Sequence, residues 1–139
     1  MISAVNNQGL SAFAFQRSAV RRYSFIRFLH RLIKDYGGKG RKLFVICDNC
    51  RIHHAKLVAA WCEAHKEEIE LFFLPSYSPE LNPDEFLNRQ LKTSLRVKGP
   101  KNHEETLEHA KEITSTFKSQ KTPIRACFTN ESTLYAQAA

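Results

Sequence analysis

Residues 42–75 read KLFVICDNCRIHHAKLVAAWCEAHKEEIELFFLP, and these residues carry the strongest secondary-structure pattern of the sequence. KLFVICDN is a continuous apolar run closed by an acid, which is typical of a buried parallel strand whose carboxyl end meets a functional loop. IELFFLP predicts a second apolar strand, which Pro75 stops. Strand–helix–strand order implies a βαβ unit, so the predicted class is α/β. HHAKLVAAWCEAHKEE is the helix of this unit, with an inner stripe of Leu57, Val58, Trp61 and Ala64.

Shorter patterns predict elements on both sides of this unit. They are strands at 2–5 and 10–16, and helices at 23–36, 83–95 and 103–120. Gly37 ends the first of these helices, Gly99 and Pro100 break the second, and the tail after Pro123 is weakly patterned. With 139 residues, 42% of them apolar, the chain is expected to form one domain over residues 1–139. The expected core includes Phe25, Phe28, Trp61, Phe72 and Phe73.

The net charge of +7 is concentrated in two basic blocks, residues 17–42 and 86–103, which together contain a single acid, Asp35. Two such blocks on a small domain favour a polyanionic partner, and nucleic acid is the commonest. Solvated helix faces that aid solubility are the other interpretation. No apolar run approaches the roughly 18 residues of a membrane span, and the start lacks the order of a signal peptide. We therefore expect no membrane partner, a cytoplasmic location and reduced thiols.

A loop rich in Pro and Ser, SYSPELN, leads into a helix that opens with two acids. Asn82 is a good N-cap, Pro83 suits the first helical position, and Glu85 lies three residues after the cap. This spacing predicts a capping box, in which the Glu85 side chain reaches back to Asn82 and stabilises the helix by about 1 kcal/mol. A capping role explains Glu85 but leaves Asp48 unexplained.

Asp48 ends the first strand of the βαβ unit, and Glu85 opens the helix after the second strand. If the two strands are neighbours in a parallel sheet, both carboxylates lie near the edge where open α/β sheets place their sites. Two carboxylates suit Mg²⁺ or Mn²⁺, which prefer oxygen ligands. Such ions activate water and stabilise a displacement at phosphorus. Together with the basic blocks, the two acids indicate a metal-dependent enzyme that acts on nucleic acid.

The segments CDNCRIHHAK and WCEAHKEEIELFFLPSYSPELNPDEFLNRQLK resemble the catalytic half of bacterial insertion-sequence transposases related to the mariner superfamily. The strand ending in Asp-Asn, the HHAK after it and the pattern LPxYSPELNPDE carry the resemblance, which extends over almost the whole chain. It implies a DDE catalytic domain with a ribonuclease-H-like fold, a mixed sheet flanked by helices. It also implies metal-dependent cleavage and transfer of DNA strands in transposition and integration, with double-stranded DNA of the transposon ends and target as partner.

The resemblance assigns roles to matching positions of this sequence. Asp48 matches the second catalytic Asp and Glu85 the catalytic Glu, and both are implied to bind Mg²⁺ or Mn²⁺. Asp84 matches an accompanying acid that is not a metal ligand. The implied site-lining residues are Asn49, His53 and Tyr77. The expected contacts with the DNA backbone, which set affinity without reading sequence, are Arg89, Lys92, Arg96 and Lys98.

The family also has a third carboxylate, an Asp on a first strand that precedes the segment matching MISAV. Because this sequence begins at Met1, we expect it to be truncated at the N-terminus and to lack this central strand and the family's upstream helix-turn-helix region. Asp35 lies on a predicted surface helix and cannot replace the missing acid. We therefore expect weak or absent metal binding, no activity of the chain alone, and self-association through unpaired strand edges.

Three alternatives stay open. The spacing C-x₂-C-x₂-H-H suggests a zinc-stabilised binding module, although structural zinc sites usually have two ligand pairs separated by a longer loop; the residues are Cys47, Cys50, His53 and His54. A non-catalytic DNA-binding or regulatory protein derived from a transposase would keep the basic surface and pair with a full-length transposase. In the third alternative another reading frame supplies the missing strand, and this chain is the carboxyl-terminal part of an active enzyme.

Overall fold

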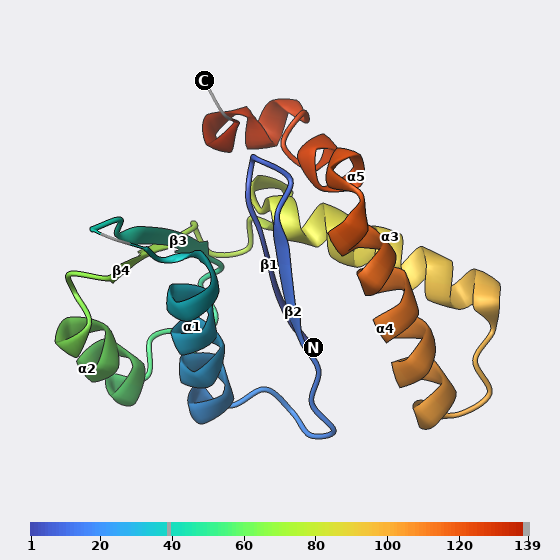
Figure 1. Ribbon diagram of the computed structural model, residues 1–139, viewed down its shortest axis with the longest axis horizontal. Coiled ribbons are helices and arrows are strands. Elements are labelled where there is room, and N and C mark those ends of the chain that lie inside the picture. The colour runs from blue at the N-terminus through green and yellow to red at the C-terminus, as the bar shows by residue number, and fades with distance from the viewer. Residues whose placement is uncertain (39, 138–139) are drawn as a thin grey trace. The chain divides into compact units, whose positions relative to one another are not determined.

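The structure, a computed structural model, describes residues 1–38 and 40–137 (Figure 1). Its class is mixed α/β, with small sheets flanked by helices, as predicted. The elements in chain order are β1 (Ile2–Val5), β2 (Ser11–Ala14), α1 (Arg22–Tyr36), β3 (Leu43–Cys47), α2 (Lys56–Ala64), β4 (Ile69–Phe73), the 3₁₀ turn η1 (Pro79–Leu81), α3 (Pro83–Lys98), α4 (His103–Ser119), α5 (Lys121–Ala126) and the 3₁₀ turn η2 (Glu131–Ala136).

The chain divides into two compact units. The first unit comprises Met1–Ile2 and Gln16–Pro79, and the second comprises Ser3–Phe15 and the chain from Glu80 onward. The strands of the described residues form two separate two-stranded sheets, β1–β2 and β3–β4. None of the helices within residues 1–38 and 40–137 is long and apolar enough to cross a membrane.

The first unit is built on the predicted βαβ arrangement. Strands β3 and β4 pair in parallel, with Leu43 opposite Ile69 and Cys47 opposite Phe73. Helix α2 connects them, and α1 and α2 lie on the same side of the sheet (Figure 1). The buried side chains of this sheet and its two helices are Phe25, Phe28, Leu29, Leu32, Cys47, Val58 and Ile69. The parallel register brings the carboxyl ends of both strands to one edge, where the loops after Cys47 and Phe73 begin.

Two predictions for the first unit are wrong in detail. Phe72 and Phe73, which were expected in the core, are 45% and 42% exposed. Within the first unit, helices lie on one face of the β3–β4 sheet (Figure 1), and Phe72 shares the other face with the exposed Phe44 and Ile46 of β3. Phe73 points to the face opposite Phe72, but it is the last residue of the strand, and its ring packs against His54. On α2, Val58 is buried as predicted, but Leu57 and Ala64 are exposed and Trp61 is half-buried.

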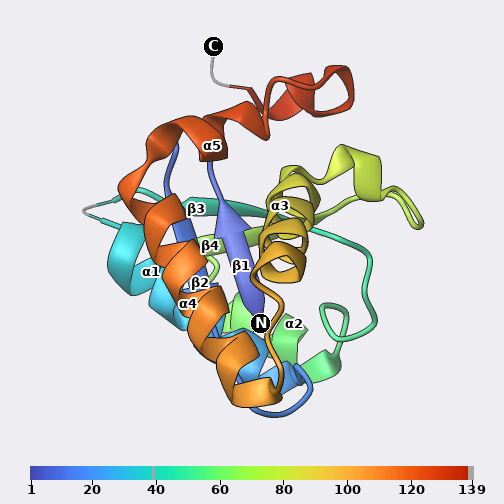
Figure 2. The ribbon, with the colours of Figure 1, turned by 90° about the vertical axis from the view of Figure 1, so that its right-hand side faces the viewer.

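The second unit contains the β1–β2 hairpin, α3, α4, α5 and η2. Asn6 makes the hairpin turn: its N–H donates to the Leu10 carbonyl at 2.9 Å, and its side-chain oxygen accepts from the N–H groups of Gln8 and Leu10. Helix α4 lies beside α3 and β2 (Figure 2). The core among these elements consists of Phe13, Leu87, Leu91, Ala110, Ile113, Phe117, Ile124, Cys127 and Phe128. The tail after Pro123, which lacked a clear pattern, contributes the last three of these side chains.

Candidate active site

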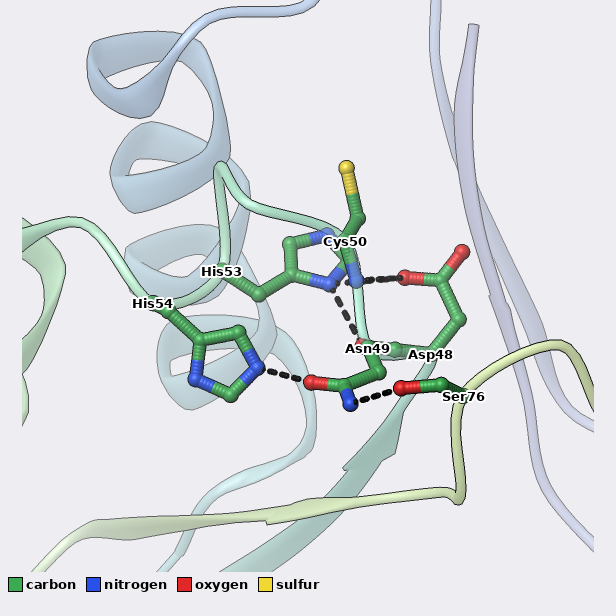
Figure 3. Close-up of polar contacts among 6 residues, drawn as sticks. All are labelled: Asp48, Asn49, Cys50, His53, His54 and Ser76. Atoms are coloured by element: carbon green, nitrogen blue, oxygen red, sulfur yellow. Dashed lines mark hydrogen bonds and ion pairs between the residues drawn. The ribbon is translucent and has the colours of Figure 1, made fainter.

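Asp48 directly follows β3, at the edge of the sheet. Its Oδ1 accepts a 3.2 Å hydrogen bond from the Cys50 N–H and lies 2.9 Å from Nδ1 of His53 (Figure 3). Its Oδ2 has no hydrogen-bond partner in the part of the chain that the structure describes, and the side chain is exposed. One carboxylate oxygen is therefore held by the protein while the other stays available for a ligand.

His53 is fixed from two directions. Its Nδ1 also lies 3.0 Å from the backbone carbonyl oxygen of Asp48. Its ring packs against Phe25 of α1, with ring centroids 4.3 Å apart, and its side chain is only 18% exposed. The predicted site-lining residue His53 thus contacts the predicted catalytic residue Asp48.

Asn49 joins the loop after β3 to the loop after β4. Its Oδ1 is hydrogen-bonded to Nε2 of His54, and its Nδ2 donates to the Ser76 hydroxyl at 2.6 Å. The His54 ring packs against Phe73, with ring centroids 4.1 Å apart. His54 and Ser76 were not among the predicted site residues, although the repeated His and the Ser-rich loop were visible signals in the sequence.

Tyr77 follows Ser76 at the tip of this loop. Its side chain is fully exposed, and its backbone has a φ of +57°, in the left-handed region. This conformation costs an L-residue other than Gly roughly 1 kcal/mol or more. The anchor between Asn49 and Ser76 therefore holds the loop that presents Tyr77, the third of the predicted site-lining residues.

Glu85 lies in the first turn of α3. The predicted N-cap is confirmed, because the Asn82 side chain accepts from the Asp84 N–H at 3.1 Å and Pro83 is the first helical residue. The predicted capping box is wrong: only the backbone N–H of Glu85 contacts Asn82, through its carbonyl oxygen. The Glu85 carboxylate is half-buried and has no hydrogen-bond or ion-pair partner among residues 1–38 and 40–137. Capping therefore does not account for this acid.

The neighbouring acid, Asp84, is engaged differently. Its Oδ2 accepts a 2.7 Å hydrogen bond from the Ser3 hydroxyl on β1 and a 3.1 Å bond from the Asn88 amide. These contacts tie the first turn of α3 to the hairpin. Of the two acids that open the helix, Asp84 is bound to protein groups and Glu85 is not.

The basic residues of α3 fall into two groups. Arg89, Lys92 and Arg96 are exposed and lie 4, 7 and 11 positions after Glu85, which places all four on one face of the helix. The opposite face carries the buried Leu87 and Leu91. Lys98 projects elsewhere and forms a 2.7 Å ion pair with Glu112 of α4. Hydrogen bonding to Lys98, together with its charge, lowers the pKa of Glu112.

The Cys and His residues of the C-x₂-C-x₂-H-H motif do not form a zinc site. Cys47 is buried, and burial raises the pKa of its thiol to about 12. Cys50 is exposed, and the two His rings contact Asp48 and Asn49 instead. In the described ranges, 1–38 and 40–137, no three His, Cys, Asp or Glu side chains form a group that could hold a metal ion.

The free oxygens of Asp48 and Glu85 are the donors that fit a hard divalent cation such as Mg²⁺ or Mn²⁺. Asp48 belongs to the first unit and Glu85 to the second. The assignment of both acids to one metal site stays a prediction, as do the proposed DNA contacts.

Comparison with curated proteins gave no match. A family model for the DDE superfamily endonuclease domain matches residues 1–108, which include Asp48, His53, Glu85 and the basic residues of α3. The match covers more than half of the chain and both carboxylates with free oxygens. The chain therefore belongs to the family of DDE superfamily endonucleases.

Proposed function

We propose that the chain is part of the catalytic domain of an insertion-sequence transposase related to the mariner superfamily. In this proposal Asp48 and Glu85 bind Mg²⁺ or Mn²⁺, and the substrate is double-stranded DNA of the transposon ends and target. One observation carries the proposal: within a DDE endonuclease family member, each of these two acids keeps carboxylate oxygen that no described protein group occupies.

Each group has a separate task in the reaction. A bound divalent ion supplies activation of water and neutralises charge that develops at phosphorus. The Asp48 and Glu85 side chains hold that ion, and the loop anchored by Asn49 and Ser76 fixes Asp48 on the end of its strand. Asp48 and Glu85 are two carboxylates of a site that the family builds from three, so we propose that these two acids alone bind the ion weakly and that cleavage needs the complete set.

The face of α3 that carries Glu85 would lie along the DNA backbone. Arg89, Lys92 and Arg96 follow Glu85 on this face and have no acidic partner among the described residues. Lys or Arg side chains of this kind bind phosphates and release counterions, which supplies affinity without sequence preference. Shared placement on one helix face therefore supports a role in bringing phosphates toward the acid that binds the metal.

The metal assignment is tested by titrating the chain with MnCl₂ in a calorimeter. We expect weak binding to the wild-type protein and its loss in both Asp48→Asn and Glu85→Gln. Asp35→Asn is a matched control, because Asp35 is exposed on α1 and pairs with Arg31 at 3.7 Å. Equal heats for the wild type and the two site variants would remove the metal site from the proposal.

A non-catalytic DNA-binding or regulatory protein derived from a transposase is the second candidate. The basic face of α3 favours it, because that face needs neither a metal ion nor a complete set of acids. Such a protein would bind DNA in the presence of a chelator and pair with itself or with a full-length transposase. DNA binding that is unchanged in Glu85→Gln, combined with no Mn²⁺ binding by the wild type, would select this candidate.

A further inference from the structure

Two consecutive histidines contact two consecutive residues at the end of β3, and they use different ring nitrogens. His53 approaches Asp48 with Nδ1, and His54 approaches Asn49 with Nε2 (Figure 3). Figure 3 shows both rings turned back toward the end of the strand. The loop of residues 48–54 is thus held by two side-chain contacts that join its end to its beginning.

The partner atoms decide where the proton of each ring lies. Both atoms facing Nδ1 of His53, the Asp48 Oδ1 at 2.9 Å and the Asp48 carbonyl oxygen at 3.0 Å, can only accept, so Nδ1 must carry the proton. The structure orients the Asn49 amide so that Nδ2 donates to the Ser76 hydroxyl and Oδ1 faces Nε2 of His54; with the amide in this orientation, Nε2 of His54 carries the proton. The two neutral rings are therefore opposite tautomers.

Packing keeps each ring in place. Phe25 on α1 lies against the His53 ring, and Phe73 on β4 lies against the His54 ring, at centroid distances of 4.3 and 4.1 Å. The two histidines consequently connect the loop after β3 to a helix on one side and to the neighbouring strand on the other. These ring contacts hold the two His side chains at the edge of the sheet, and neither of them involves a metal-binding group.

We propose that His53 and His54 are positioning residues that act through these opposite tautomers. His53 occupies Oδ1 of Asp48 and so directs Oδ2 outward, toward the divalent ion. His54 orients Asn49, which holds the Ser76 loop at the same edge. This inference rests on the proposed metal role of Asp48. It explains the two histidines of the C-x₂-C-x₂-H-H motif as outer partners of the site rather than as metal ligands themselves.

The tautomers are read directly from long-range ¹H–¹⁵N correlation spectra of the uniformly ¹⁵N-labelled chain, at alkaline pH where imidazole rings are neutral. Six His residues give separate patterns, which single His→Gln variants assign. We expect the Nδ1–H form for His53 and the Nε2–H form for His54. The same tautomer for both rings, or the reverse assignment, would overturn the inference.

Amide replacements supply a second readout, the dissociation constant for Mn²⁺. An Asn side chain places its N–H group near the Nδ1 position, whereas a Gln side chain places it near Nε2. His53→Asn should therefore bind Mn²⁺ nearly as well as the wild type, and His53→Gln about tenfold or more weakly. For His54 the order reverses, with Gln retaining affinity and Asn losing it. Equal losses for Asn and Gln at each position would contradict a positioning role.

The two levels of the proposal fail separately. If the wild-type chain binds no Mn²⁺, the proposed metal site fails, and the NMR tautomers alone decide whether the histidines hold Asp48 and Asn49 as inferred. If the chain binds Mn²⁺ and this binding requires Asp48, but the measured tautomers differ from those inferred, the metal site stands and the positioning role of the histidines is removed.

Discussion

The Ser3 hydroxyl on β1 donates a 2.7 Å hydrogen bond to the carboxylate of Asp84 in the first turn of α3, across 81 positions of the chain. Asn88, one turn further along α3, donates to the same oxygen at 3.1 Å. The hairpin is thereby joined to the helix turn that carries Glu85. Asp84 serves this junction, which leaves Glu85 as the acid of the pair that is available to a ligand.

Removal of the Ser3 hydroxyl should weaken that junction. Ser3→Ala is expected to lower the free energy of unfolding by about 1–2 kcal/mol. The variant loses the hydrogen bond that the Ser3 hydroxyl donates to the charged Asp84 carboxylate. Urea unfolding monitored by circular dichroism measures the change. Ser18→Ala is the control, since Ser18 is exposed and makes no side-chain hydrogen bond in the described part of the chain. A Ser3 variant as stable as this control would count against the junction.

The end of α3 depends on the backbone of Gly99. Its φ is +59°, and a Cβ placed there would meet no atom within 4 Å. Gly99→Ala should therefore destabilise the protein by about 1 kcal/mol through backbone conformation alone, and Gly99→Asn should cost less, because Asn tolerates this region. Gly38→Ala is the matched control, with equally open space but no positive φ. Identical effects of Ala at both positions in thermal unfolding would disprove this explanation.

The basic face of α3 and Lys98 should contribute unequally to DNA binding. Arg89→Ala, Lys92→Ala and Arg96→Ala should each reduce the slope of log affinity against log salt by about 1, as expected when one phosphate contact is lost. Lys98→Ala should change the slope less, because Lys98 is paired with Glu112 at 2.7 Å. Fluorescence anisotropy with a labelled DNA duplex at several salt concentrations gives these slopes. A Lys98 effect equal to the other three would mean that its ion pair opens on DNA.

The ion pair between Lys98 and Glu112 should also depend on pH. The pKa of Glu112 is lowered by the Lys98 hydrogen bond, so its contribution to stability is present at neutral pH and lost as pH falls through the lowered pKa. We expect a small stability difference between wild type and Glu112→Gln at pH 7 that vanishes in acid. Both side chains are exposed, so high salt should reduce the difference. A difference that persists at pH 2 would point to a cause other than charge.

The cysteines should differ sharply in reactivity. Burial raises the pKa of Cys47 to about 12 and that of Cys127 to about 11, so both remain thiols at pH 9, whereas Cys50 is exposed. Iodoacetamide should therefore modify Cys50 first in the folded chain, as peptide mass spectrometry would show. Because the raised pKa values favour the protonated folded state, stability should fall as pH rises from about 9 toward 12. Rapid modification of Cys47 under native conditions would contradict the buried strand end.

Sequence patterns predicted the βαβ unit because its apolar runs, connecting helix and strand-ending Pro all agree. They could not show that the helices of the first unit lie on one face of β3–β4, since an apolar run reads the same when one face is open, and Phe72 was misplaced for this reason. Phe73 lies on the other face and is exposed at the end of its strand. Helix α5 was missed because it is six residues long and contains a Pro. Such short elements are fixed by tertiary packing of residues such as Ile124 rather than by a periodic pattern.

Within the candidate site, the sequence indicated the acids and the histidines but not their relations. Helical spacing alone could have shown that Lys98 lies on a different face from Arg89, Lys92 and Arg96. Its ion pair with Glu112 could not be predicted, because Glu112 lies 14 positions away on another helix. The spacing from Asn82 predicted a contact of the Glu85 side chain with the Asn82 N–H, and only the structure shows that the capping contact is the Asn82 side chain accepting from the Asp84 N–H. Two adjacent His residues were equally compatible with metal ligation until their partners, Asp48 and Asn49, were located.

The most direct measurement is a titration of the ¹⁵N-labelled chain with substoichiometric Mn²⁺, followed in ¹H–¹⁵N spectra. A paramagnetic ion held by both Asp48 and Glu85 should broaden the amide signals of residues 47–54 and 82–89 in parallel, and Glu85→Gln should abolish the broadening in both segments. Broadening of only one segment, or broadening that Glu85→Gln leaves unchanged, would show that the two acids do not share a metal ion.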